Sequence, residues 1–350
     1  MQDNRLILGF YIEPHVWICR GGEHIDAERI TAEECLEVVF TKVLPYGIEI
    51  CAQRQGFIVA AFPEELLSIR VSEIKSANLL PMSAALFAID FFNAFLFLLY
   101  DQTYKFYNQK YHSIKQAVNV SDLWRWISIS SDNLALVARE QPMPILNQHE
   151  MLSIDTAPYL LLKSIGQLTE HDKQFRWTQS TTVLDQALEA MFVNHDYRLN
   201  WQLMALLNKA LWSIQKAEFA EAHVLSWSVA EKLIGIEWIN FIASTNEPVG
   251  DKGEKTINRK RKDQLNSPDY EASKRIEVLE LAKVLSYDLY RRLHEARKTR
   301  NKWIHNLENV SQEDCRQCYF AARDMLSRKL KYNLEHPGSY YFQDEHMPTN

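Results

Sequence analysis

Residues 273–305 read SKRIEVLELAKVLSYDLYRRLHEARKTRNKWIH and decide how the C-terminal half of the chain is interpreted. Apolar residues recur there with the three- to four-residue spacing of a helix that is buried along one side. They are Ile276, Leu279, Val284, Leu289 and Leu293. The pattern predicts one long helix from Ser273 to about Ile304, packed on other helices by this apolar stripe.

Similar helical patterns lie before and after this stretch. They cover Val183–Val193, Leu199–Gln215 and Ala217–Ile242, and the last of these has Val224, Trp227, Val229, Leu233 and Ile234 as its apolar positions. Ser311 is expected to cap a final helix that ends before Pro337. Residues 196–335 are therefore predicted to form a four-helix bundle, and residues 336–350 a loose tail.

A charged segment, Glu247–Pro268, separates two of these helices and is expected to be an exposed loop. Although the formal net charge of the whole chain is −6, residues 251–305 hold 15 Lys and Arg against 9 Asp and Glu. A basic segment on an acidic protein indicates a localised anionic partner. The candidate ligands for RNA phosphates in this loop are Lys252, Lys255, Arg259, Lys260, Arg261 and Lys262, with a merely solvated loop as the alternative.

The end of the stretch 273–305 holds Arg300, Asn301 and, four residues after Asn301, His305. RNA cleavage needs a base for the 2′-hydroxyl and an acid for the 5′-oxygen, and histidine titrates in the range that suits both. A guanidinium can stabilise the charge that develops on the phosphate. We therefore take Arg300, Asn301 and His305 as candidate catalytic residues, with Arg297, Lys298 and Lys302 as candidate RNA-binding residues beside them.

A straight helix in a single chain would not bring the side chains of Arg300 and His305 to one point. At about 100° per residue, Arg300 and His305 lie roughly 140° apart around a straight helix. Either the helix unwinds near His305, or a second protomer completes the site.

The spacing of Arg300 and His305 resembles the Arg-x4–6-His signature of HEPN domains. Residues 227–233, WSVAEKL, resemble the second helix of these domains, and the order of helices and loop also fits. Over roughly Leu199–Leu334 the chain resembles the Apea-like HEPN group of bacterial phage-defence proteins. This resemblance implies an all-α HEPN bundle and a metal-independent endoribonuclease without a cofactor. It also implies a toxin-like role in antiviral defence or growth arrest.

The resemblance further implies a homodimer, and a trigger such as a phage-derived or antitoxin protein sensed by the N-terminal region. Some members of the family have lost catalysis, so a non-catalytic HEPN protein that binds RNA, a nucleotide or a protein partner is the second hypothesis. The residues alone also allow a simpler interpretation. His305 could merely cap its helix, and Arg300 could be a solvated cation.

Other polar or aromatic residues of the bundle have structural interpretations. Glu231 is expected to pair with Arg300 or Arg297 inside the bundle. Trp201, Trp212, Trp227 and Trp238 are expected in the core rather than as platforms for bases. Cys315 and Cys318 have a CxxC spacing, but further ligands at matching spacing are missing, so we expect two packed helix cysteines and no metal.

The first 195 residues are expected to form a separate region, a small α+β module followed by helices, which makes the fold class α+β. Short apolar runs predict strands at Leu6–Ile12, His15–Cys19, Ile48–Ala52 and Phe57–Phe62. A helix is expected at Thr31–Leu44, with Thr31 as its N-cap.

The stretch Leu79–Tyr100 is long and apolar enough to cross a membrane, but Asp90 and Asn93 lie at its middle. We expect a buried core helix, with a membrane-associated effector as the open alternative. The first residues, MQDNRLILGF, lack a basic segment and a long apolar run, so we expect no signal peptide and a cytoplasmic protein without membrane contact.

Overall fold

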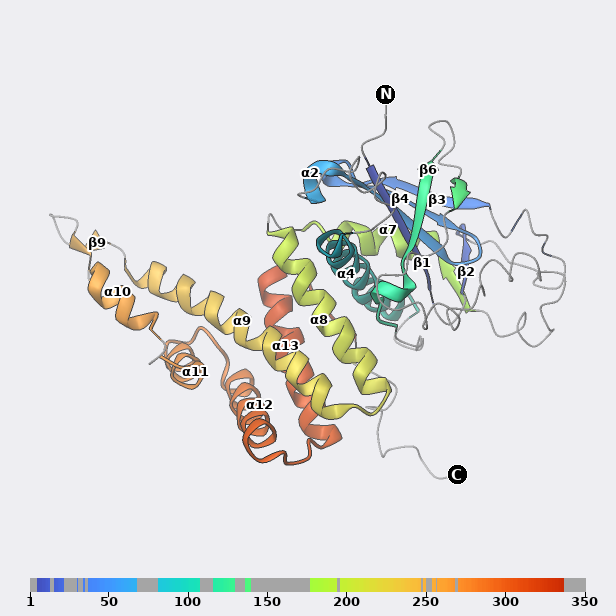
Figure 1. Ribbon diagram of the computed structural model, residues 1–350. Helices are drawn as coiled ribbons and strands as arrows, with labels where there is room; N and C mark the ends of the chain where they lie inside the picture. The colour runs from blue at the N-terminus through green and yellow to red at the C-terminus, as the bar shows by residue number, and fades with distance from the viewer. Residues whose placement is uncertain are drawn as a thin grey trace, which may run out of the picture. The chain divides into compact units, whose positions relative to one another are not determined.

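A computed structural model shows two compact units, residues 1–205 and 206–350, which are described separately below (Figure 1). The residues that the structure describes are 5–12, 16–21, 30, 34, 37–67, 81–107, 116–129, 136–139, 177–193, 196–246, 248–249, 254–255, 257–267 and 270–336. The first unit contains a β-sheet with helices, and the second is helical apart from one short hairpin, so the fold is α+β as expected.

The first unit contains a six-stranded antiparallel sheet in the order β3-β4-β5-β1-β6-β7. Its strands are β1 (Arg5–Tyr11), β3 (Val38–Val43), β4 (Glu49–Gln53), β5 (Phe57–Pro63), β6 (Trp124–Ile129) and β7 (Leu136–Arg139). A separate parallel pair is formed by β2 (Val16–Cys19) and β8 (Trp177–Ser180). The four strands predicted from apolar runs are confirmed as β1, β2, β4 and β5.

Glycine is required in the middle of this sheet. Gly9 of β1 lies opposite Val59 of β5. A Cβ atom at Gly9 would lie 2.7 Å from both the carbonyl oxygen of Ile58 and the ring of Phe57. The Phe57 ring therefore occupies the space that any other residue would need.

The prediction of a helix at Thr31–Leu44 is wrong for its second half, because Val38–Val43 is an edge strand paired with β4. The β-branched pair Val38 and Val39 favours the extended conformation, and pairing with β4 satisfies the backbone there. Thr31 lies outside the described residues.

The apolar stretch forms α4 (Met82–Phe106), and 72% of its most apolar 18 residues is buried within the structure. Two of its buried polar residues have partners there. Asn93 donates to and accepts from the backbone of Val118, at 2.9 Å each, and Asp101 forms an ion pair of 2.7 Å with Lys105. Phe91 and Phe92 pack on Phe62 of the sheet. The helix passes the length and composition test for a membrane span, but its burial agrees with the expected core helix.

The shorter helices of the first unit are α2 (Glu64–Leu67) and α7 (Thr181–Ala190), which packs on α4. Single 3-10 turns lie at Pro45–Gly47 and Val120–Asp122. Helix α8 (Tyr197–Gln215) runs from the first unit into the second.

The second unit is built on α9 (Phe219–Thr245), α12 (Tyr287–Asn306) and α13 (Gln312–Leu330), together with the later part of α8. Helix α9 packs along α13 and also contacts α11 (Ala272–Leu281) and α12. Trp227 of α9 and Tyr319 of α13 are among the largest fully buried side chains. Ser311 caps α13 through a hydrogen bond from the Asp314 amide to its Oγ, as predicted.

Two predictions in this unit are wrong. The single helix expected from Ser273 to Ile304 is divided into α11 and α12, because Lys283 has φ +61° and Ser286 caps a new helix by accepting from the Leu289 amide. The segment Glu247–Pro268 is not wholly a loop. It contains a short hairpin of β9 (Pro248–Val249) and β10 (Glu254–Lys255), and then α10 (Arg259–Leu265), which Asn258 caps.

Candidate functional site

Helix α12 carries Arg300, Asn301 and His305 and is regular over its whole length. It buries Leu289, Leu293 and Ala296 against its neighbours and continues to Asn306. It ends at Leu307, which has the left-handed values φ 55° and ψ 30° and donates its amide to the Trp303 carbonyl at 2.9 Å. The helix therefore ends near His305 but does not unwind between Arg300 and His305, so unwinding does not bring these two side chains together.

Arg300 and Asn301 are held together. Arg300 lies about 20° around the helix from buried Leu293, so its stem starts on the bundle-facing side. The side chain is half-buried, and Nη1 donates to Oδ1 of Asn301 at 3.0 Å. Asn301 thereby fixes the direction of the guanidinium, which keeps its other donors for a further acceptor.

His305 lies on the other side of the helix and is exposed. The continuous helix keeps it about 140° from Arg300, so one chain does not bring the two side chains to one point. Two exposed apolar residues lie at this end of the helix: Ile304 is 40% exposed and Leu307 is 77% exposed.

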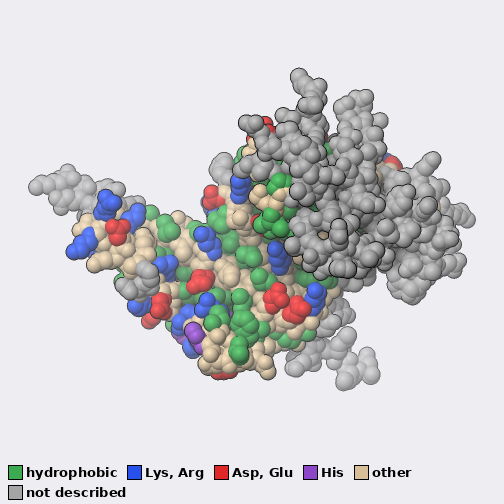
Figure 2. Space-filling model, viewed as in Figure 1, with side chains coloured by type: hydrophobic (Ala, Val, Ile, Leu, Met, Phe, Trp, Pro, Cys, Tyr) green, Lys and Arg blue, Asp and Glu red, His purple; other side chains and the backbone are tan. Residues whose placement is uncertain are grey.

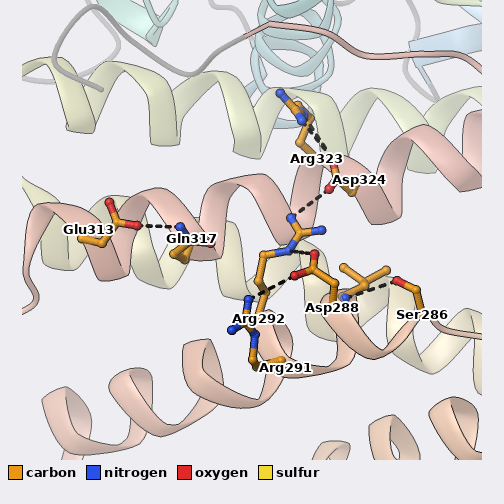
Figure 3. Close-up of polar contacts among 9 residues, drawn as sticks. Ser286, Asp288, Arg291, Arg292, Glu313, Gln317, Arg323 and Asp324 are labelled. Atoms are coloured by element: carbon orange, nitrogen blue, oxygen red, sulfur yellow. Dashed lines mark hydrogen bonds and ion pairs between the residues drawn. The ribbon is translucent and has the colours of Figure 1, made fainter. Parts of the chain in front are cut away.

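The rotation of α12 is fixed by a polar network with α13 (Figure 3). Arg292 lies between Asp288 of its own helix, at 2.9 Å, and Asp324 of α13, at 2.8 Å. Arg323 reaches the same Asp324 at 3.0 Å. Because Arg292 is only 18% exposed, this network is better shielded from solvent than an ordinary surface pair.

A buried histidine, His223, ties α9 to α12 and was not predicted from the sequence. Its Nε2 lies 2.9 Å from the carbonyl oxygen of Ala296, and since a carbonyl only accepts, Nε2 carries the proton. Cys318 of α13 donates to the His223 carbonyl at 3.5 Å. Burial lowers the pKa of His223, which keeps the ring neutral near pH 7. The sequence feature that could have indicated a buried His223 is its position four residues before Trp227, on the same face of the predicted helix.

The cations near Arg300 differ in their surroundings. Lys298 forms an ion pair of 2.8 Å with Glu295, and this hydrogen bond lowers the pKa of Glu295. Lys302 is exposed, whereas Arg297 is half-buried and its Nε has no hydrogen-bond partner within the described chain.

The expected ion pair of Glu231 with Arg297 or Arg300 is wrong, because Glu231 is exposed on α9 and forms no such pair among the described residues. Trp201, Trp227 and Trp238 are buried, as expected of core residues. Trp212 is only half-buried, with Lys216 over its ring.

Cys315 and Cys318 are fully buried in α13, which confirms two packed cysteines. Burial raises the pKa of the Cys315 thiol to about 12. Among the residues that the structure describes, no group of three or more His, Cys, Asp or Glu side chains is placed to hold a metal ion.

The basic cluster of the expected loop lies on α10. Arg259, Lys260, Arg261 and Lys262 are all exposed there, and Figure 2 shows Lys and Arg side chains gathered at this end of the helical unit. The helix buries none of its residues, but Trp238 and Tyr270 stack behind it, and Trp238 Nε1 donates to the Leu265 carbonyl at 3.0 Å. Lys252 lies outside the described residues, and of Lys255 only the backbone is described.

We expect the exposed cations of α10 to contact RNA phosphates. Changing the four of them to Gln should weaken RNA binding and reduce the slope of log Kd against log salt by about 0.7 for each lost contact with a single strand. Fluorescence anisotropy at several salt concentrations measures this slope. The control replaces four exposed lysines elsewhere in the helical unit with Gln, namely Lys216, Lys232, Lys283 and Lys331. An identical slope in both variants would show that α10 is only solvated.

A scan against protein-family models, a search of curated proteins and a search of solved structures each found no match for this chain.

Proposed function

We propose that the helical unit is an HEPN-type endoribonuclease that cleaves RNA without a metal ion. His305 serves as general base for the 2′-hydroxyl and as general acid for the leaving oxygen. Arg300 stabilises the negative charge on the phosphate, and Asn301 orients the guanidinium. The observation that carries this proposal is an exposed His305 on the same rigid, basic helix as a guanidinium held by its neighbouring Asn301.

The charge of α12 supports an RNA substrate. The helix contains six Lys or Arg and two acidic residues, a net charge of +4 within a chain whose total is −6. Both acidic residues are paired with cations of the helix, Asp288 with Arg291 and Arg292, and Glu295 with Lys298. Lys302 and Arg300 form no ion pair in the described part of the chain and remain available for phosphate.

We further propose that the active form is a symmetric homodimer. A twofold axis near the C-terminal end of α12 would place Arg300 of one chain near His305 of the other, which one helix cannot do. Exposed Ile304 and Leu307 supply apolar surface for such a contact. Lys298 and Lys302 would repel their copies, and a bound phosphate backbone would relieve this repulsion.

The biological role proposed next rests only on the resemblance to HEPN domains. We propose a cytoplasmic defence or growth-arrest nuclease whose N-terminal region senses a trigger, such as a phage-derived or antitoxin protein.

A second candidate is an HEPN-type protein that binds RNA, a nucleotide or a protein partner without cleaving. The separation of Arg300 and His305 around α12 favours it, since a single chain offers cationic contacts but does not bring the histidine and the arginine to one phosphate. Incubation of purified protein with labelled RNA separates the two candidates, because only the nuclease yields shorter products.

Cleavage by the proposed mechanism should persist in EDTA and leave a 2′,3′-cyclic phosphate. An imidazole that removes the 2′-hydroxyl proton drives internal attack on the phosphate, and the arginine supplies the positive charge. Mass spectrometry of the products identifies the cyclic end. An RNA with a 2′-deoxy residue at the scission point is the control and should stay intact. Strict dependence on Mg²⁺, or cleavage of DNA, would contradict the mechanism.

A further inference from the structure

The outward face of α12 carries three stacked rings that the proposed chemistry does not use. The rings of Tyr287 and Tyr290 lie 5.9 Å apart with an interplanar angle of 28°, and those of Tyr290 and His294 lie 5.7 Å apart at 23°. We call Tyr287, Tyr290 and His294 the aromatic ladder. Tyr287 is 67% exposed, while Tyr290 and His294 are half-buried.

The ladder shares its face with His305. Eighteen residues separate Tyr287 from His305, which is about five full turns, so the two point in nearly the same direction. Lys298 lies within about 20° of this direction, and Lys302 within about 60°. The three rings and exposed Arg291, about 40° from this direction, therefore occupy the first half of the face, and Lys298 and Lys302 with the candidate catalytic histidine occupy the second.

A stack of rings that ends in an exposed tyrosine, beside cations, matches the chemistry of unpaired nucleic acid. Bases of a single strand stack on such rings, while lysines follow the backbone, and neither contact needs a particular base. In a duplex the bases already stack on one another, so their faces are not open to a tyrosine. A protein partner is less well matched, because within the first half of α12, all of which the structure describes, Tyr287 is the only large apolar side chain that is exposed.

We propose that the aromatic ladder is a platform for the bases of single-stranded RNA, leading the strand along α12 to His305. The inference rests on the proposed function in taking RNA as the ligand, and it deepens that function by specifying unpaired substrate. At 1.5 Å per residue, Tyr287 lies about 27 Å from His305, a length that accommodates several nucleotides. The bound bases would lie several nucleotides away from the scissile phosphate, on one side of it only.

The direct test measures binding rather than cleavage. Full-length His305→Ala protein, in which we expect cleavage at least about 100-fold slower, is titrated with single-stranded RNA containing 2-aminopurine, whose fluorescence falls when it stacks. We expect quenching in this background. Adding Tyr287→Ala should weaken binding about fivefold or more, and adding Tyr290→Ala as well should remove the quenching. Tyr287→Phe and Tyr290→Phe keep the rings and should bind within about twofold of the parent.

Two controls and one single variant make the result decisive. Ile239→Ala removes another exposed apolar side chain, 56% exposed on α9, and should change nothing. Tyr287→Ala alone is informative even if the double variant unfolds, because Tyr287 is so exposed. Duplex RNA of the same length should bind with the same Kd with or without the tyrosines.

Unchanged single-strand affinity and quenching in a folded Tyr287→Ala/Tyr290→Ala protein would overturn the inference. So would a shift of the oligomer toward monomer in sedimentation, since the ladder would then contact a second copy. If wild-type protein never cleaves RNA but the quenching depends on the tyrosines, the nuclease proposal fails and the platform stands. If the protein cleaves RNA and the tyrosines do not affect binding, the platform fails and the nuclease proposal stands.

Discussion

His305→Ala should lower the rate of RNA cleavage by at least about 100-fold while leaving the helical unit folded. General acid–base catalysis by a positioned side chain contributes about 10²- to 10⁴-fold, and in the proposed mechanism one imidazole takes part in both proton transfers. His305 is exposed, so its loss costs no core packing. Single-turnover cleavage of a labelled RNA, measured beside thermal unfolding, separates a catalytic defect from a folding defect.

Arg300→Ala should cause a loss of about 10²- to 10³-fold, the usual effect of removing one group that stabilises charge in the transition state. Arg300→Lys should restore only part of the rate, because a lysine keeps the charge but not the two-pronged geometry. Lys232→Ala removes an exposed cation of α9 and is the matched control. A wild-type cleavage rate in folded His305→Ala protein would rule out His305 as the general acid and base.

Two inactive variants should complement each other when mixed. If Arg300 of one protomer works with His305 of its partner, a mixed dimer of Arg300→Ala and His305→Ala chains holds one intact site and one doubly defective site. Random exchange of equal amounts places about half of the chains in mixed dimers, so about a quarter of the wild-type activity should return. The measurement is cleavage before and after subunit exchange, with exchange verified by differently labelled chains.

The same geometry predicts that the double variant Arg300→Ala/His305→Ala poisons the wild-type protein. In a tenfold excess of the double variant, about nine in ten wild-type chains pair with a defective partner and lose both sites. Activity per wild-type chain should therefore fall to about one tenth. If exchange is proven and the single variants do not complement, each protomer works alone and the shared site is wrong.

The helix that carries Arg300 and His305 could be predicted because its signals are local. The apolar spacing of Leu289 and Leu293 set its buried face, and Ser311 marked the start of the next helix. The break before Ser286 was not predictable from the same signals, since the apolar stripe continues through Val284 and neither glycine nor proline marks the turn. A lysine at φ +61° is an uncommon conformation, held here by the packing and hydrogen bonds around it.

Contacts between residues far apart in the sequence explain the other differences between the predictions and the structure. The apolar residues of Val38–Val43 have helical spacing, but the segment also has β-branched residues. It forms a strand because β4 is available as a hydrogen-bonding partner. In the site, the pairing of Arg300 with Asn301 follows from their adjacency. By contrast, the bond of His223 to Ala296 joins residues 73 positions apart, and periodicity within one helix cannot predict it.

The break between α11 and α12 also determines where the chain can change its length. Residues 282–286 separate two helices, so an insertion there lengthens the connection and does not rotate the residues of α12, which starts after Ser286. One extra residue between Leu293 and Arg300 would instead turn everything beyond it by about 100°, carrying His305 away from the aromatic ladder and Arg300 away from the bundle-facing side. Insertions and deletions in related chains should therefore collect before Ser286 and be absent from the helix that follows it.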